Sequence, residues 1–137
     1  VTNGPVVNES LETSVEGVFA CGNVLHVHDL VDFVAEEASE TGKAVVKKLC
    51  GTAPVPKNPT VAGKNLRYAS PHKFACGEEI HFRFRPTICA DKAILTAKSG
   101  EKIVSSWKLN FVNPAEMIQI AFTPENCTEL LFELEEI

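Results

Sequence analysis

The sequence predicts an α+β fold, in which two short strands and one helix precede a small antiparallel β-sandwich. Residues 29–49 place apolar side chains every three to four positions, which is typical of a helix with one packed face. Residues 64–137 instead alternate apolar and polar side chains, as strands do. The intervening residues 51–63 hold three prolines and two glycines. Because spaced prolines exclude a helix and stiffen the chain, we expect 51–63 to be a linker between residues 1–50 and residues 64–137.

The composition excludes several classes of protein. The chain has 137 residues, 45% of them hydrophobic, and a formal net charge of -5. An acidic chain without a basic cluster is not expected to bind nucleic acid. We expect no membrane partner, because no apolar run approaches the roughly 20 residues that cross a bilayer. Five single cysteines and no recognisable signal peptide favour a cytoplasmic location, and the start at Val1 rather than methionine suggests a fragment.

The first part is predicted to order its elements as strand, turn, strand and helix. Residues 5–8 suggest a short strand and residues 13–16 a polar turn. Residues 17–22 form an apolar run closed by glycine, which suits a buried parallel strand. Cys21 lies inside this run and is expected to pack as a small hydrophobic residue.

The helix at 29–49 has recognisable start and stop signals. Acidic Asp29 and Asp32 stand near its start, lysines stand near its end, and Gly51 follows as a stop. The apolar positions that share one face are Leu30, Val34, Ala38, Val45 and Leu49. A packed partner for this face is expected.

The second part is predicted to form an Ig-like or similar β-sandwich. Its strand-like runs are 80–85, 94–97, 103–111, 117–122 and 130–134. One core face is expected from Ile80, Phe82 and Phe84, and another from Trp107, Leu109 and Phe111. The basic side chains His81, Arg83 and Arg85 share the opposite face of the first strand. They could bind an anion, but we expect a solvated sheet face.

One stretch of the first part resembles a known cofactor motif. The sequence TSVEGVFACGN, from Thr13 to Asn23, is similar to the second FAD fingerprint of the two-dinucleotide-binding-domain flavoproteins. In that family a threonine, a turn and a glycine lead into a strand that reads Val/Ile-Phe/Tyr-Ala-x-Gly-Asp. Residues 4–7 resemble the strand that precedes this motif, and the helix at 29–49 resembles the last helix of the FAD domain. The likeness covers residues 3–49, and residues 21–32 further resemble bacterial NAD(P)/FAD-dependent oxidoreductases.

The resemblance implies that this chain is the C-terminal part of an FAD-dependent pyridine-nucleotide(-disulfide) oxidoreductase, with NAD(P)H as co-substrate. Gly22 would let the backbone approach FAD closely. Asn23 stands where the family has an acid that binds a ribitol hydroxyl, and its amide can still accept and donate hydrogen bonds. Leu30 and Val31 would offer backbone N–H groups at the helix start, facing the pyrimidine ring of the flavin. The expected cofactor-binding residues are therefore Gly22, Asn23, Leu30 and Val31.

Other parts of such an enzyme have no counterpart in the sequence. No Gly-x-Gly-x-x-Gly follows a strand, no nicotinamide-binding domain is present, and no CxxC pair occurs. The chain alone is therefore expected to hold FAD weakly or not at all, to be inactive, and to contain no catalytic residue. Its expected partners are the rest of the parent flavoenzyme and, through the apolar helix face, further copies of itself.

Two alternatives remain open at this point. His26 and His28 could bind a metal ion, but two histidines beside Asp29 and Asp32 also describe an ordinary helix start, so no metal site is predicted. In the flavoprotein setting these histidines would border the isoalloxazine ring or a dimer interface. The alternative function is a non-enzymatic β-sandwich binding module, on which the first strand–helix segment merely docks.

Overall fold

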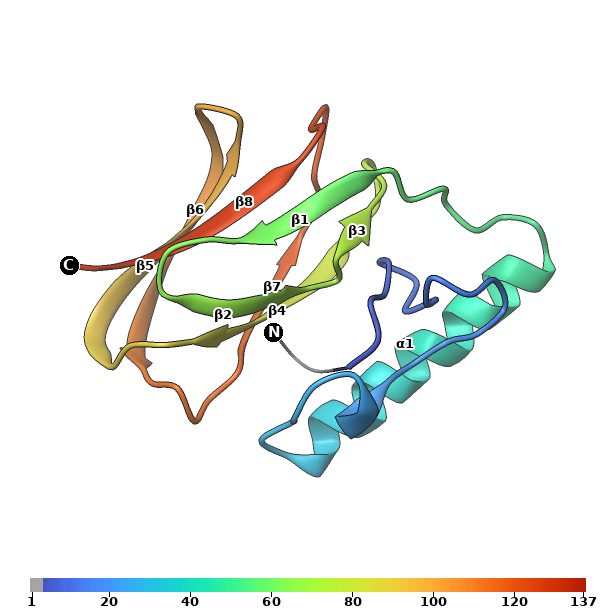
Figure 1. Ribbon diagram of the computed structural model, residues 1–137, viewed down its shortest axis with the longest axis horizontal. Helices are drawn as coiled ribbons and strands as arrows, with labels where there is room; N and C mark the ends of the chain where they lie inside the picture. The colour runs from blue at the N-terminus through green and yellow to red at the C-terminus, as the bar shows by residue number, and fades with distance from the viewer. Residues whose placement is uncertain (1–3) are drawn as a thin grey trace.

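The computed structural model describes residues 4–137 and has a mixed α+β fold, with one α-helix and two sheets (Figure 1). The first three residues of the predicted flavin-domain range 1–50 lie outside the described residues. The first part contains the 3₁₀ turn η1 (Gly22–Val24) and the helix α1 (Val31–Leu49). The strands that follow are β1 (Asn58–Ala62), β2 (Leu66–Ser70), β3 (Lys73–Phe74), β4 (Ile80–Pro86), β5 (Ala90–Ser99), β6 (Lys102–Val112), β7 (Ile118–Phe122) and β8 (Leu130–Glu136).

The strands form a five-stranded sheet, in the order β3-β1-β8-β5-β6, and a three-stranded sheet, in the order β2-β4-β7. The strand pairs are antiparallel except for β1 and β8, which run parallel and pair Thr60 with Leu130. The predicted linker is therefore wrong for residues 58–62, which are a strand. Pro59 is tolerated because it stands near the start of β1, where few ladder bonds are lost. We call residues 58–137 the two-sheet unit.

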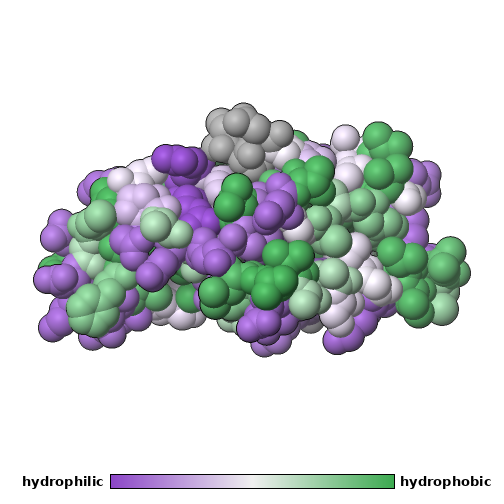
Figure 2. All heavy atoms as spheres, turned by 90° about the horizontal axis from the view of Figure 1, so that it is seen from below, coloured by the Kyte–Doolittle hydropathy of each residue, from purple (hydrophilic) through white to green (hydrophobic). Residues whose placement is uncertain are grey.

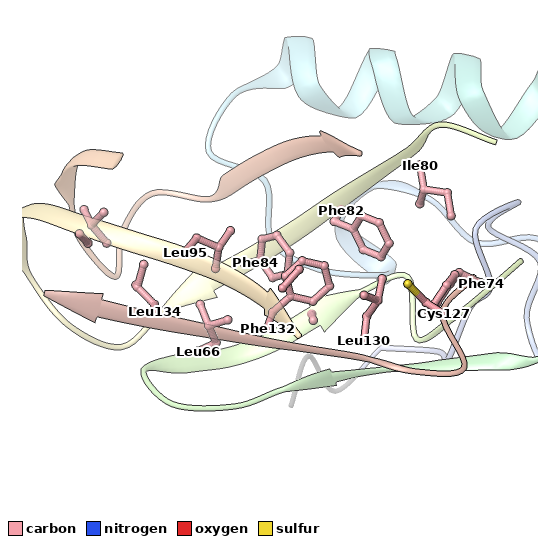
Figure 3. Packing of buried hydrophobic residues seen from close by; sticks show 14 of the residues in the cluster. Leu66, Phe74, Ile80, Phe82, Phe84, Leu95, Cys127, Leu130, Phe132 and Leu134 are labelled. Carbon is pink, nitrogen blue, oxygen red and sulfur yellow. The ribbon is translucent and has the colours of Figure 1, made fainter. Parts of the chain in front are cut away.

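Aromatic side chains of both sheets meet in one hydrophobic core (Figure 3). Phe82 and Phe84 of β4 face Phe132 of β8, with ring centroids 5.0 and 4.6 Å apart, respectively. All three side chains are fully buried. The core face predicted for β4 from its alternation is thus confirmed.

Strand β6 departs from its predicted alternation at its end. Trp107 and Leu109 are half-buried and pack against the core, but Phe111 is 75% exposed. Phe111 has a φ of 55°, in the left-handed region, and the next residue, Val112, is buried instead. One left-handed residue interrupts the two-residue period of a strand, so the expectation that Phe111 shares the core face is wrong.

The two strands predicted before the helix do not form. Residues 5–8 and 17–22 contribute only isolated bridges, Val7 with Thr13, Glu12 with Phe19, and Asn8 with Lys73. A strand needs a continuous partner, and the described residues offer this segment single contacts only. It folds instead around a small cluster of its own, formed by Val7, Leu11, Ala20 and Leu25.

The helix α1 begins two residues later than predicted and ends where expected. It lies on the side of β4 and β7 that faces away from the core (Figure 3). Its buried face is polar, because Glu37 and Thr41 are its buried residues, while Leu30 at the N-cap and Leu49 are exposed. Val34 and Val45 are half-buried. The helix therefore meets the two-sheet unit mainly through charged groups. Within residues 4–137, no helix has both the length and the apolar character that spanning a membrane requires.

Candidate functional site

The carboxylate of Glu37 is the centre of a buried polar cluster between α1 and the preceding loop. Its Oε1 accepts a hydrogen bond from the backbone N–H of Gly22 at 2.6 Å. The Nε2 atoms of His26 and His28 lie 2.8 and 3.1 Å from its two oxygens. The three side chains are essentially inaccessible to water. Glu37 thus fixes the loop of residues 22–28 against the first turns of α1.

The surroundings of Glu37 keep it ionised. Burial alone would raise its pKa, but the hydrogen bond and charge of His26, the Gly22 N–H and the charge of Arg83 together lower the pKa to about 2. The Nε of Arg83 lies 3.5 Å from Glu37 Oε2. A buried carboxylate with several donors remains anionic at neutral pH.

Strand β4 supplies the basic partners of the helix. Arg83 donates from Nη2 to Glu40 at 2.8 Å, and His81 also contacts the Glu40 carboxylate through Nδ1. Arg83 is only 3% exposed. The expectation of a solvated face for Arg83 and Arg85 is therefore wrong, because α1 and the loop before it cover that face and place carboxylates opposite the guanidinium groups.

Arg85 ties the loop before α1 to the two-sheet unit. Its Nη1 donates to Asp29 Oδ1 at 2.8 Å and to the Ala115 carbonyl at 2.7 Å, and its Nη2 donates to the Val27 carbonyl at 2.7 Å. The second Asp29 oxygen accepts from the backbone N–H of Met117 at 2.5 Å. Asp29, predicted to begin the helix, lies just before it and joins the loop to the sheet.

The residues that the flavin resemblance singles out lie on this same loop. Gly22 is buried with a φ of 73°, and a Cβ there would lie 3.4 Å from Val34. Its left-handed φ, which glycine adopts readily, begins the 3₁₀ turn η1, and Gly22 does not end the predicted strand. Asn23 is exposed, and its Oδ1 accepts from the backbone N–H of His28 at 3.2 Å. Leu30 and Val31 are exposed at the start of α1, which has no side-chain cap.

His26, His28 and Glu37 offer the kind of donor set that zinc accepts, with their ligand atoms within 4.8 Å of one another. Two features of the cluster disfavour a cation. The Arg83 guanidinium next to Glu37 would repel it. The buried Nδ1 atoms of both histidines also lack a hydrogen-bond partner among residues 4–137, whereas metal-ligating histidines usually bond a second group. We interpret the cluster as a hydrogen-bonded ion-pair network.

The paired charges of this site were missed by the sequence reasoning, although a signal was present. Glu37 and Glu40 are three residues apart on a helix and therefore share a face. Arg83 and Arg85 are two residues apart on a strand and share a face as well. Arg83 meets both acids of the helix face, and Arg85 meets Asp29 of the loop before the helix. This charge complementarity predicts docking of the helix and its preceding loop on the strand.

A shallow hollow of about 250 Å³ lies beside the same helix. Its lining carries both signs of charge: Glu9, Glu40, Lys43, Lys47, Glu78, Glu79 and His81. Lys47 and Glu78 already pair across it at 2.9 Å. The mixture favours no single class of ligand.

Comparison of the chain with protein-family models, with curated proteins and with solved structures gave no match.

Proposed function

We propose that this chain is the C-terminal part of a flavin-dependent NAD(P)H oxidoreductase, and that its first 50 residues complete the FAD site of that enzyme. One observation carries the proposal: the 3₁₀ turn η1, which opens at Gly22 with a left-handed φ and contains Asn23, is followed by an exposed, uncapped helix start at Leu30 and Val31. This arrangement leaves an amide side chain and free backbone N–H groups open to a ligand.

Each of these groups has a chemical task on this proposal. Asn23 already accepts the His28 N–H through Oδ1, so its Nδ2 group is left to donate to a ribitol oxygen of FAD. The first N–H groups of α1 have no acceptor within the helix and carry the positive end of the helix dipole. They would stabilise negative charge that develops on the pyrimidine side of a reduced isoalloxazine. FAD supplies the electron transfer, and NAD(P)H supplies the hydride.

On the same proposal the two sheets form a β-sandwich that serves the enzyme as an interface and carries no catalytic residue. Aromatic contacts between the two sheets, such as Phe84 of β4 with Phe132 of β8, support the sandwich. The proposed enzyme is cytoplasmic and oligomeric.

The test is Asn23→Leu in the full-length flavoprotein that contains these residues. The change removes both hydrogen-bonding functions, so we expect the purified variant to retain less FAD, measured by absorbance after gel filtration. Asn110→Leu is the matched control, because Asn110 is an exposed amide on β6. Unchanged flavin occupancy in the Asn23 variant would contradict the proposal, and a full-length protein without flavin would favour the binding-module alternative.

A further inference from the structure

We propose that the two-sheet unit holds the flavin loop in its binding conformation, with Arg85 as the positioning residue. The flavin loop is defined as Gly22–Val31. This inference rests on the proposed function and gives the two-sheet unit a direct role in cofactor binding, which a simple interface would not have.

Arg85 holds the second half of the loop from outside. It joins three acceptors from two segments that are far apart in the sequence: the Val27 carbonyl and Asp29 on the loop, and the Ala115 carbonyl on the connection between β6 and β7. The N–H of Met117 holds the other Asp29 oxygen from that same connection. Strand β4 and the connection between β6 and β7 therefore hold Val27 and Asp29 by hydrogen bonds. These two residues lie immediately before the exposed helix start.

Glu37 holds the first half of the loop from inside. It bonds the Gly22 N–H and contacts both histidines, and Arg83 of β4 lies against it. The loop is thus anchored at Gly22, His26, His28 and Asp29. Asn23, Leu30 and Val31 remain exposed between or beside these anchors.

This arrangement satisfies the geometric need of a cofactor site. Groups that bind a ligand gain affinity when the protein has already ordered them, because less conformational entropy is lost on binding. A loop whose binding groups are exposed while neighbouring residues are fixed by hydrogen bonds is ordered in this way. Lysine could not replace Arg85, because only the planar guanidinium presents enough donors in fixed directions to reach all three acceptors.

The experiment compares two single variants, Arg85→Lys and Asp29→Asn, with the wild type. Arg85→Lys keeps the positive charge but loses the planar guanidinium and its several N–H donors in fixed directions. Asp29→Asn keeps one oxygen, removes the charge and removes the second oxygen that accepts from Met117. Amide hydrogen exchange of residues 22–31 is measured in the 137-residue chain, and FAD affinity is measured in the full-length flavoprotein. We expect exchange about tenfold faster and FAD affinity at least about tenfold weaker, because charge-assisted hydrogen bonds are lost.

Leu95→Ala is the control for general loss of stability. Leu95 is fully buried in the core and belongs to β5, outside the flavin loop and its anchors. At a temperature where all variants are folded, Leu95→Ala should leave FAD affinity and exchange of residues 22–31 near wild type. An effect of Leu95→Ala as large as that of Arg85→Lys would overturn the positioning role.

The outcomes separate the two proposals. If Asn23→Leu leaves FAD binding unchanged, the proposed function fails. If Asn23→Leu weakens FAD binding while Arg85→Lys and Asp29→Asn do not, the flavin site stands and the positioning role of Arg85 is wrong. Unchanged hydrogen exchange of residues 22–31 in both Arg85→Lys and Asp29→Asn would also overturn that role, whether or not the protein binds flavin.

Discussion

A carboxylate buried away from water is tolerated only when hydrogen-bond donors and positive charges surround it, and Glu37 meets this requirement. The Gly22 N–H, two imidazoles and a guanidinium approach its two oxygens. Removing any one of these partners would leave the negative charge of Glu37 incompletely compensated. At the residue scale, Glu37 is therefore the position at which a conservative substitution is most informative.

We predict that Glu37→Gln reduces the loss of stability in acid. The folded-state pKa of Glu37 is about 2, below its ordinary value of 4.5, so ionised Glu37 stabilises the fold above about pH 5 and this contribution disappears as the pH falls toward 2. Between pH 7 and pH 3 the wild type should lose about 2 kcal/mol from this group. Urea unfolding at several pH values measures it. Glu36→Gln, an exposed neighbour, should behave as wild type, and an unchanged acid slope in Glu37→Gln would contradict the assignment.

Ionised Glu9 is predicted to reduce the stability of the fold, whereas ionised Glu37 increases it. Its pKa is raised, because desolvation by burial outweighs the backbone hydrogen bonds that lower it, and its Oε2 has no hydrogen-bond partner among residues 4–137. The folded state therefore favours protonated Glu9, and ionisation above the raised pKa reduces stability. Glu9→Gln keeps an oxygen for the Ala75 N–H and should stabilise the chain at pH 7, by less than about 1 kcal/mol. The gain should vanish near pH 4 in thermal unfolding, and destabilisation at pH 7 would count against this reasoning.

At the scale of single elements, β6 and β8 differ in how deeply they enter the core. Trp107 of β6 is half-buried and contacts Phe122 and Phe132, whereas Phe132 of β8 is fully buried and contacts aromatic rings of both sheets. We predict that Phe132→Ala destabilises by about 3–5 kcal/mol and Trp107→Ala by less, about 2–3 kcal/mol. Equilibrium urea unfolding compares them. An equal or larger effect at Trp107 would show that the edge strand carries more of the core than its burial indicates.

The boundary of the two-sheet unit depends on β1. A fragment that starts at residue 64 lacks β1, so the β8 residues Leu130 and Phe132 lose their parallel partners and β3 loses the strand with which it pairs in the sheet. We predict that residues 54–137 unfold cooperatively, as followed by circular dichroism, and that residues 64–137 are markedly less stable or unfolded. Equal stability of the two fragments would instead support residue 64, the boundary expected from the sequence.

These elements show which features the sequence could predict. Strand β4 and helix α1 were predictable, because alternation and helical period are local patterns that a core imposes on neighbouring residues. Strand β1 was not, because its parallel partner lies about 70 residues later and three prolines dominate the local signal. The strand expected at residues 17–22 failed because apolar character alone does not supply a pairing partner. Burial of the polar face of α1 was missed because it depends on charge pairing with β4.

At the scale of the whole molecule, the apolar face of α1 and the flavin loop remain largely uncovered. The exposed apolar side chains along them are Val24, Val27, Leu30, Val31, Val46 and Leu49. Val31 and Leu49, at the two ends of the helix, are 78% and 82% exposed. Figure 2 views the molecule from below Figure 1 and shows apolar groups gathered toward the end where α1 lies. In the proposed enzyme the remainder of the FAD domain would cover this surface.

Without that cover, the surface should drive self-association of the chain. We predict a dimer or higher oligomer by light scattering at high concentration, because exposed apolar side chains are removed from water when copies pair through them. The double variant Val46→Lys and Leu49→Lys should be monomeric. Lysine is compatible with the last turns of a helix, where the dipole favours positive charge, so the helix itself should persist by circular dichroism.

Ile103→Lys is the matched control for this test. It also replaces an exposed apolar side chain with a charge, but on β6 rather than on α1, and it should leave the oligomer intact. A wild-type chain that stays monomeric at high concentration would contradict self-association altogether. Dissociation by Ile103→Lys but not by the helix variant would move the interface to the edge strand β6, because unpaired backbone groups at a sheet edge can also join two copies. The helix face would then stay free for the remainder of the proposed flavoenzyme.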